Sequence, residues 1–442
     1  MARIHVGQKP SVSMNYQFSK APACTFLVLM CVLLTAQVQA AAPSLPQNID
    51  AGALLQHAEQ SLPLPALTGQ GLAVDTPVKL QASGSDVQIT VNRFEFAGNQ
   101  VIPSAELAKL LTHFLNQPLS FEILQQAPEV VATFYRNRGL VVQVYLPQQE
   151  IEDGVVRIEI VESTFGRLII QEPQPHRIQS SRLLGMVEAA QPSGQALNRW
   201  QIDRALLLMN DLPGLQFNGN LVEGDQDGQT NLLLGVKDDA LFTGNVSLDN
   251  TGSRATGSDR FNVNLNINNP ARWGDALSLN FLQTKGSDYQ RLSYVFPLGY
   301  GGGRAGVHAS QMNYKVIEGE VSSLDASGSA ITQGLEWRYP LIRSATTNLH
   351  WTSGFDDKTF DNQSNTPSHY SVQALFTGLS GNVYDAWWGG GANTAGLQWT
   401  GGSVNLSGSP SESIDASGAQ TAGRYGKWTI TASREQHVTD QT

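Results

Sequence analysis

Cysteine is almost absent from this sequence of 442 residues, which contains only Cys24 and Cys31. Charged side chains are also scarce, at 15% against about a quarter in ordinary soluble domains. The formal net charge is −10, with 28 basic and 38 acidic residues, and such a balance disfavours binding to nucleic acid. After residue 40 no apolar run is long enough for a membrane-spanning helix. These features argue against a coiled coil, a basic nucleic-acid binder and a charge-rich disordered chain.

The first 40 residues have little in common with the rest of the chain. They contain three basic residues and no acidic one, and an apolar run over 26–34 precedes Val38-Gln39-Ala40. A basic start, a short apolar stretch and a small residue at the end predict a secretory signal peptide over residues 1–40. Both cysteines lie in it. We therefore expect a processed chain with no disulfide and a net charge of −13, from 25 basic and 38 acidic residues.

Signatures of catalysis and of nucleotide binding are missing as well. None of the histidines after residue 40 lies in a Gly-x-Ser-x-Gly or His-Glu-x-x-His motif, and no His/Cys cluster has the spacing of metal ligands. The three glycines at 301–303 are not followed by the Lys-Ser/Thr of a phosphate-binding loop, so they are interpreted as a turn between strands. We expect no enzymatic activity, no metal and no cofactor.

Between residues 41 and 239 the chain alternates short strand and helix patterns. Residues 41–86 predict one short helix over 50–60 and a linker rich in Pro, Gly and Ala. Residues 87–163 predict a compact unit with the order β-α-α-β-β, and residues 164–239 repeat that order with little sequence identity. Ser104 and Asn198 are expected to cap helices in these units.

From residue 240 to 442 the pattern changes to strict alternation. Residues 261–268 read Phe-Asn-Val-Asn-Leu-Asn-Ile-Asn, which places four amides on one face and four apolar side chains on the other. Similar alternation predicts about ten strands, most of them near the ~9–11 residues that a tilted transmembrane strand needs. A short turn is expected at 269–273, and longer loops are expected at 317–329, 356–368 and 407–423.

The alternation favours an antiparallel transmembrane β-barrel, with a soluble β-sandwich as the alternative. The apolar face recurs in nearly every strand and aromatic residues lie near strand ends, as lipid-facing strands require. The polar face would then line a wet channel or simply fill the lumen. The residues predicted to line the pore are Asn245, Asn262, Asn264, Asn266, Asn280 and Arg291.

Several short motifs have an order and spacing shared with one known family. Residues 94–99, Phe-Glu-Phe-Ala-Gly-Asn, lie in the first β-α-α-β-β unit. The turns of the predicted barrel carry the other motifs, namely Asp249-Asn250-Thr251-Gly252 with Thr256-Gly257, Asn269-Pro270 with Gly274-Asp275, and Tyr339-Pro340-Leu341-Ile342-Arg343-Ser344. Over residues 50–434 the chain thereby resembles the transporters of bacterial two-partner secretion, the haemolysin secretion/activation family.

The resemblance implies a fold and a location. It implies a plug helix, two periplasmic POTRA modules of β-α-α-β-β order, and an outer-membrane barrel of about sixteen strands. The sequence departs from this pattern, because it has no Val-Arg-Gly-Tyr-type motif and ends at Thr442 after about ten strands. An unfinished sheet leaves backbone groups unpaired in hydrocarbon. We therefore expect a C-terminally truncated form, with closure of a ten-stranded barrel as the alternative.

The resemblance also implies a function and partners. It implies an outer-membrane transporter whose POTRA modules recognise a large, unfolded, β-helical exoprotein of the haemolysin or adhesin type, which leaves through the pore without nucleotide hydrolysis. Outer-membrane lipid and the barrel-assembly machinery are further expected partners, and nucleic acid is not. The alternatives are an outer-membrane barrel-assembly factor and a general porin. Porins do not normally carry two α/β modules, and an outer-membrane hydrolase has no motif to support it.

Two groups of site residues follow. An exposed strand edge binds an extended peptide through backbone hydrogen bonds, so the client is expected on the second strand of the first unit. The residues of this site are Val141, Gln143 and Tyr145, with Phe134 on the adjacent helix, unless Phe134 and part of the strand belong to the core. The resemblance also implies that the helix at 50–60 plugs the resting pore through Leu54, Leu55 and His57, with a linker and no plug as the alternative.

Overall fold

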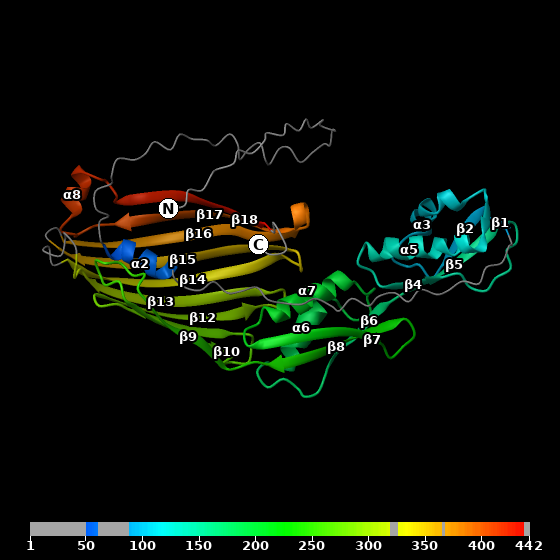
Figure 1. Ribbon diagram of the computed structural model, residues 1–442, viewed down its shortest axis with the longest axis horizontal. Coiled ribbons are helices and arrows are strands. Elements are labelled where there is room, and N and C mark those ends of the chain that lie inside the picture. The colour runs from blue at the N-terminus through cyan, green and yellow to red at the C-terminus, as the bar shows by residue number, and fades with distance from the viewer. Residues whose placement is uncertain (1–49, 61–87, 319–325, 365–366, 437–442) are drawn as a thin grey trace, which may run out of the picture. The chain divides into compact units, whose positions relative to one another are not determined.

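A computed structural model describes residues 50–60, 88–318, 326–364 and 367–436 (Figure 1). The predicted signal peptide over 1–40, most of the predicted linker and residues 319–325 lie outside the described residues. The helix predicted over 50–60 is present as α2 (Ala51–Gln60). Within the described ranges no helix is both long and apolar enough to cross a bilayer.

The first module, residues 88–162, packs its helices against a three-stranded sheet of order β2-β5-β4. Strand β2 is parallel to β5 and β4 is antiparallel to it. Ala127, Val131 and Tyr135 recur every four residues, so they form one buried stripe of a helix that faces the sheet. The elements are β1 (Gln88–Thr90), β2 (Arg93–Ala97), α3 (Ser104–Leu110), η1 (Thr112–Phe114), β3 (Pro118–Ser120), α4 (Phe121–Leu124), α5 (Gln126–Arg136), β4 (Val142–Tyr145) and β5 (Val155–Glu162).

The two predicted helix caps have different outcomes. The prediction for Ser104 is wrong, because it is the first residue of α3 and Pro103 occupies the N-cap position. The fixed φ of proline suits a helix entrance, and the Ser104 hydroxyl accepts a hydrogen bond from Asn99 Nδ2 at 3.1 Å instead of capping. The cap at Asn198 is confirmed, since its side chain accepts from the backbone N–H of Trp200 at 3.0 Å.

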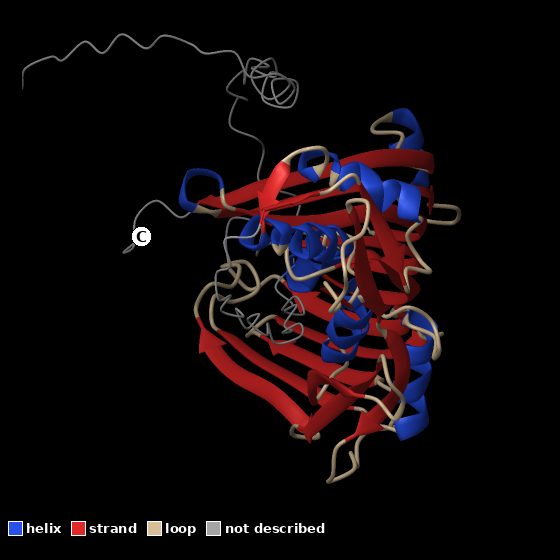
Figure 2. Cartoon of the chain, turned by 90° about the vertical axis from the view of Figure 1, so that its right-hand side faces the viewer, coloured by secondary structure: helices blue, strands red, loops and turns tan. Residues whose placement is uncertain are grey.

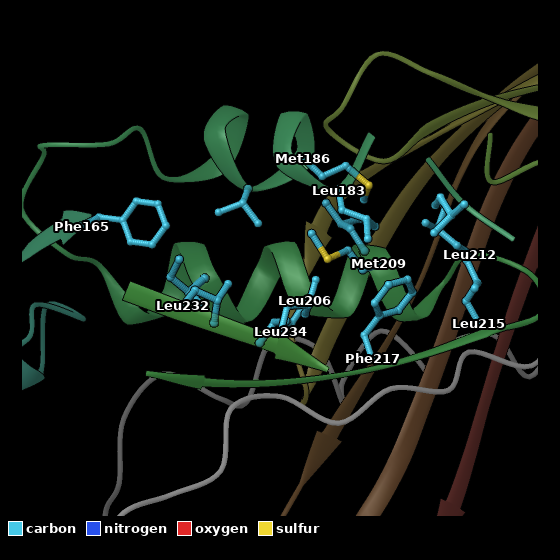
Figure 3. Packing of buried hydrophobic residues seen from close by; sticks show 14 of the residues in the cluster. Phe165, Leu183, Met186, Leu206, Met209, Leu212, Leu215, Phe217, Leu232 and Leu234 are labelled. Atoms are coloured by element: carbon cyan, nitrogen blue, oxygen red, sulfur yellow. The ribbon is translucent and has the colours of Figure 1, made fainter. Parts of the chain in front are cut away.

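The second module, residues 164–238, repeats the same topology, with strand order β6-β8-β7. Strands β6 and β8 are parallel, and β7 is antiparallel to β8. Its two helices and its sheet enclose Phe165, Leu183, Leu206, Met209 and Leu232, as Figure 3 shows. The elements are β6 (Thr164–Ile170), α6 (Ser180–Ala190), α7 (Arg199–Asn210), β7 (Leu215–Glu223) and β8 (Gln229–Asp238).

The remaining described residues form one antiparallel sheet of ten strands, in agreement with the predicted number. The strands lie side by side in chain order (Figure 1), and the sheet curves strongly (Figure 2). In the described part of the chain β9 and β18 form its two edges and do not pair with each other. The strands are β9 (Phe242–Asp249), β10 (Arg260–Asn268), β11 (Ala276–Gln283), β12 (Ser287–Leu298), β13 (Gly303–Lys315), β14 (Ser327–Arg343), β15 (Thr347–Gln363), β16 (Ser368–Asp385), β17 (Gly391–Asn405) and β18 (Gly423–Gln436).

The connections between strands agree only in part with the predictions. Gly301 and Gly302 lie in the predicted turn from β12 to β13, and Gly303 begins β13. The loop predicted over 356–368 is wrong for most of its length, because β15 continues to Gln363. The extra strand residues Phe360 and Asn362 are buried and contact α2, which explains why the extension is ordered. The segment after β17 contains a short helix, α8 (Glu412–Ser417).

The register gives the sheet an apolar and a polar face. We call the face that contacts α2 the inner face and the opposite one the outer face. One continuous row on the outer face joins Tyr294, Val307, Leu335, Phe355 and Leu375 across five strands. Val307, Leu335 and Leu375 each expose half or more of their surface, at 53%, 54% and 50%. Such a band of exposed apolar residues is what a lipid-facing sheet presents.

Candidate functional site

The six predicted pore-lining residues lie together on the inner face of β9 to β12. Asn245, Asn264, Asn280 and Arg291 are register partners in one row across these four strands. Asn264 Nδ2 donates to Asn245 Oδ1 at 3.2 Å, and Asn280 Nδ2 donates to Asn264 Oδ1 at 2.7 Å. Asn262 and Asn266 flank the row and bond to Asp249 and Ser278. The inner face thus begins with a ladder of neutral amides.

Helix α2 occupies the inner face beside this ladder and contacts β13, β14 and β15. Its small and apolar residues Ala51, Leu55 and Ala58 are buried in a cluster with inner-face side chains. The backbone N–H of Ala51 donates to Asn362 Oδ1 at 2.9 Å, and the hydroxyl of Tyr314 donates to the same oxygen at 2.9 Å. The N-terminal end of the helix is therefore held by polar as well as apolar contacts.

The C-terminal end of α2 is held by charge. Glu59 lies 3.4 Å from Lys358 Nζ and 3.6 Å from Arg291 Nη1, and these three side chains are only 24%, 21% and 18% exposed. Lys358 also lies 3.6 Å from Asp356, which is 3.3 Å from His308 Nε2. A chain of charged groups on the inner face therefore ends on the helix. Ion pairs this far out of water interact more strongly than exposed ones.

The three predicted plug residues differ in their surroundings. Leu55 is buried in the cluster with the inner face, Leu54 is half-buried against it, and His57 is exposed. The sequence analysis missed Glu59, which carries the ionic contacts. Its position one turn after Leu55, in a chain with few charges, is the signal that could have identified it.

Helix α2 does not fill the space above the amide ladder. A pocket of about 220 Å³ lies between Ala58 and the ladder residues Asn245, Asn264 and Asn280. Its walls are mostly polar, and a cavity of this size with several polar groups is suited to water. Helix α2 therefore covers part of the inner face, and the rest of this face is an open polar surface.

The predicted client site, strand β4, is an edge strand in the described residues. It pairs with β5 on one side and with no strand on the other. Gln143 and Tyr145 are exposed, and Val142 and Val144 pack into the module core. Val141 is already engaged by the second module, because its N–H donates to Leu197 O at 3.1 Å.

Phe134, the fourth residue of the predicted client site, is half-buried. It packs against the core of the first module, and the guanidinium of Arg138 lies 4.0 Å from the centre of its ring. The ring is therefore shared between the core and a cation–π contact.

One buried titratable group supports this module. The Tyr135 hydroxyl donates to Glu162 Oε1 at 2.7 Å, and Glu162 also accepts from the N–H groups of Gln100 and Val101. Burial, followed by the hydrogen bond and the charge of Glu162, raises the pKa of Tyr135 well above its ordinary value. The phenol stays protonated and ties α5 to the end of β5.

The second module is joined to the sheet by the motif at 339–344. Arg343 of this motif donates two hydrogen bonds to Asp211, from Nη2 to Oδ1 at 2.8 Å and from Nε to Oδ2 at 2.9 Å. Asp211 is the first residue after α7, and Arg343 is only 4% exposed. Arg204 of α7 donates to Pro340 O at 2.7 Å. The motif therefore binds the helix end of the preceding module.

A second turn motif contacts the same helix end. Asn269 has a φ of +54° and its amide donates to Pro213 O. Asp275 accepts from the backbone of Ala271 and Trp273 and from the Tyr294 hydroxyl. The Asn-Pro and Gly-Asp pairs thus build one compact turn against the second module.

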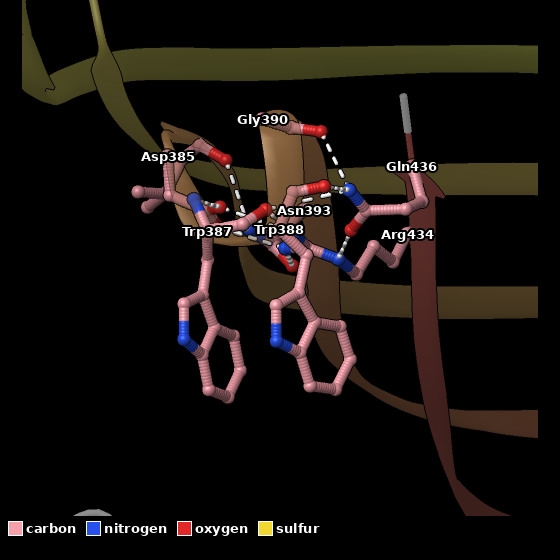
Figure 4. Close-up of polar contacts among 8 residues, drawn as sticks. Asp385, Trp387, Trp388, Gly390, Asn393, Arg434 and Gln436 are labelled. Carbon is pink, nitrogen blue, oxygen red and sulfur yellow. Dashed lines mark hydrogen bonds and ion pairs between the residues drawn. The ribbon is translucent and has the colours of Figure 1, made fainter. Parts of the chain in front are cut away.

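The sequence analysis also missed a pair of stacked tryptophans at the turn from β16 to β17. Trp387 and Trp388 have ring centroids 4.9 Å apart and an interplanar angle of 13°, and they point the same way in Figure 4. The turn is held by Arg434, which donates to Asp385 Oδ2 at 2.7 Å and to Asn393 Oδ1 at 2.7 Å. This turn lies at the same end of the sheet as the turns at 269–275 and 299–303. Tryptophan and tyrosine are common at the interface between membrane and water.

Known families match the first module and the sheet. Residues 228–442 match the family described as haemolysin secretion/activation protein ShlB/FhaC/HecB. Residues 89–163 match the POTRA domain of ShlB type.

Similar proteins are outer-membrane transporters. The chain is 26% identical over 291 residues to the heme/hemopexin transporter protein HuxB of Haemophilus influenzae (strain 86-028NP), covering 64% of this chain and 51% of HuxB. It is 24% identical over 383 residues to the outer membrane transporter CdiB of Dickeya dadantii (strain 3937), covering 83% of this chain and 65% of that protein. The chain thus spans between half and two thirds of the length of these relatives.

Two solved structures share the fold. CdiB from Escherichia coli aligns with a TM-score of 0.67 at 20% identity, over 90% of this chain and 75% of that one. CdiB from Acinetobacter baumannii aligns with a TM-score of 0.55 at 16% identity, over 80% and 70%. The comparisons and the structure therefore agree on a POTRA-type module that precedes a large antiparallel sheet. Residues 89–163 and 228–442 therefore carry two domains of the haemolysin secretion/activation family, and the chain is similar to two-partner secretion transporters of the outer membrane, whose POTRA modules lie in the periplasm.

Proposed function

We propose that this chain takes up a large unfolded exoprotein in the periplasm and passes it along the inner face of its sheet. The observation that supports the proposal is that α2 packs on that face through a few separate contacts, namely one apolar cluster, ion pairs of Glu59 and a hydrogen bond from Ala51. The buried stripe of α2 is narrow, because two of its three buried residues, Ala51 and Ala58, are alanines and only Leu55 is large. Polar contacts at both ends therefore contribute to holding the helix on this face.

The client is proposed to bind first at the free edge of β4. An extended chain that pairs there gains backbone hydrogen bonds with little demand on its sequence. Gln143 and Tyr145, exposed on the strand, would contact alternate side chains of the client. This mode suits an exoprotein of the haemolysin or adhesin type, which is rich in strands. Because Val141 is engaged by Leu197, the proposed edge begins after it.

The polar inner face is the proposed path through the membrane. Neutral amides at Asn245, Asn264 and Asn280 offer hydrogen bonds to a passing chain without a deep electrostatic trap. No nucleotide site is proposed, and directional movement would come from differential binding along the path and folding outside. Outer-membrane lipid would contact the outer face, and the barrel-assembly machinery would insert the sheet.

Ion conductance in planar bilayers tests the plug. Deleting residues 50–60 from the full chain should raise conductance, because the space now occupied by α2 becomes open. Glu59→Gln removes both ionic contacts at the C-terminal end. It should raise the open fraction about fivefold, for a loss of roughly 1 kcal/mol from two partly buried ion pairs.

His57→Gln is the matched control, since His57 is exposed on the same helix. It should leave the open fraction unchanged. Equal conductance of the wild type, the deletion variant and Glu59→Gln would refute the plug and, with it, the proposed path.

A further inference from the structure

A pocket at the junction between the second POTRA module and the sheet is lined by an excess of positive charge. It encloses about 100 Å³ between α6, α7 and the strand ends of β12 to β15. Arg182 of α6, Arg304 of β13 and Arg338 of β14 line it, together with His350 and the apolar Met186 and Leu208. Gly302, at a φ of +88°, lets the turn approach Leu208 closely and closes this side of the pocket.

The carboxylates around the pocket are already occupied. Both oxygens of Asp211 accept from Arg343. Asp275 accepts from two backbone N–H groups and from Tyr294. Glu336 lies two residues before Arg338 on the same strand, is exposed, and does not line the pocket. The three arginines that line the pocket therefore have no carboxylate hydrogen-bonded to them in the described residues.

The existing contacts of these arginines are with neutral groups. Arg304 donates to Asp211 O at 3.2 Å and to Gly274 O at 2.9 Å. Arg182 donates to Gly299 O and lies 4.9 Å over the ring of Tyr300, but its Nε is buried without a hydrogen-bond partner. For Arg338 the described residues provide no hydrogen bond or ion pair.

Loss of a proton does not reduce the repulsion among these arginine side chains, because the guanidinium group stays charged in proteins. Arg304 is repelled by both Arg182 and Arg338. The attractive charge that Arg304 and Arg338 share is Asp211, which also lines the pocket. Asp211 already accepts two hydrogen bonds from Arg343, so one carboxylate faces three guanidinium groups there. The three arginines that line the pocket come from three different elements. A planar carboxylate pairs with one guanidinium fork, whereas a tetrahedral phosphate group directs its non-bridging oxygens toward donors from different sides.

We propose that this pocket binds a phosphate group, which bridges α6 of the second POTRA module to β13 and β14. The group is either free phosphate or the phosphate of a phospholipid headgroup from the periplasmic leaflet. Its binding ties the module to the mouth of the sheet. The proposal is independent of the identity of the exported client and of the plug.

The test uses the purified full chain in detergent, with inorganic phosphate as the probe at constant ionic strength set by chloride. Wild-type protein should bind one phosphate saturably in equilibrium dialysis, and its thermal unfolding temperature should rise with phosphate. Arg338→Gln should weaken binding at least about tenfold, as expected for the loss of a charge-assisted contact. Arg338→Lys should be intermediate, and Arg424→Gln, on the exposed start of β18, should bind like wild type.

Arg182→Gln is a second variant, on the other side of the pocket, in case Arg338→Gln does not fold. Native mass spectrometry separates the two sources. A phospholipid retained by wild type but not by the variants assigns the headgroup, and saturable phosphate binding without retained lipid assigns the free anion. The proposal is overturned if wild type binds no phosphate or phospholipid saturably, if both variants bind like wild type, or if an acidic peptide binds and phosphate does not.

Discussion

The two β-α-α-β-β modules have the same topology, but their ion pairs lie in different surroundings. In the first, the ion pairs are exposed, as in Arg138–Glu106, where both side chains are more than 40% exposed. Its edge strand β4 is unpaired on one side. In the second, the end of α7 is fixed to the sheet by Asp211 and Arg343, which are 18% and 4% exposed. In the described residues both copies present an open strand edge, β4 in the first and β7 in the second, and the second copy is also anchored to the sheet through the end of its helix.

The difference in exposure predicts how much each ion pair contributes to the stability of its module. Exposed ion pairs contribute little because water and salt screen them. A pair removed from water costs desolvation when it forms, yet it is expensive to break, because one charge is left without its partner. The second module is therefore expected to be sensitive to single charge changes, and the first to be tolerant of them.

The largest expected effect breaks the anchor. Asp211→Ala leaves Arg343 nearly buried, and Asn348 and Ser344 O are then its remaining partners among the described residues. The change should destabilise the junction by about 3 kcal/mol. The loss should appear as a lower unfolding temperature and faster proteolysis between β8 and β9 in the purified chain.

Glu106→Ala is the matched control for this change. It removes the partner of Arg138 in an exposed pair and should cost less than about 1 kcal/mol. Similar losses for both variants would show that the two modules do not differ in the way proposed.

An intermediate effect concerns the core of the first module. Tyr135→Phe removes the hydrogen bond to Glu162 and should cost about 1.5–3 kcal/mol, the usual range for a bond to a charged group. Because folding raises the pKa of Tyr135, its contribution is complete below the ordinary tyrosine value of about 10 and is lost as pH rises beyond it.

The measurement is the unfolding free energy of wild type and variant from pH 7 to pH 11. Wild type should lose stability above about pH 10 more steeply than Tyr135→Phe does. Tyr145→Phe, exposed on β4, should follow the wild-type curve. Parallel curves for wild type and Tyr135→Phe would contradict the assignment.

The smallest effect on stability is expected at the binding edge. Val142→Pro and Val144→Pro each remove one N–H from the side of β4 that faces away from β5, where proline is tolerated. Both valines pack partly into the module core, so the unfolding temperature should fall modestly, while capture of an unfolded exoprotein of the haemolysin or adhesin type should fall strongly. Gln148→Pro, in the exposed loop after the strand, should capture it normally. Normal capture by both edge variants would exclude β4 as the client site.

Local pattern was enough to predict much of the architecture. The period of two in residues 261–268 requires one polar and one apolar face, whatever the strands pair with. The order β-α-α-β-β in both modules followed from short periodic segments and turn residues. The pattern also placed Asn264 and Asn280 on one face. Their hydrogen bond, however, depends on the register of β10 with β11.

The amino-acid sequence by itself determined the order of the helices and strands, the two faces of the sheet and the free edge of β4. Only the tertiary structure decided that Glu59 meets Arg291 and Lys358, that Asp211 meets Arg343, and that three arginines share one pocket. The physical reason is that the two kinds of feature depend on residues at different separations along the chain. Alternation and helix periodicity are fixed by neighbours a few residues apart, whereas these contacts join residues between 34 and 299 positions apart through packing that no local pattern records.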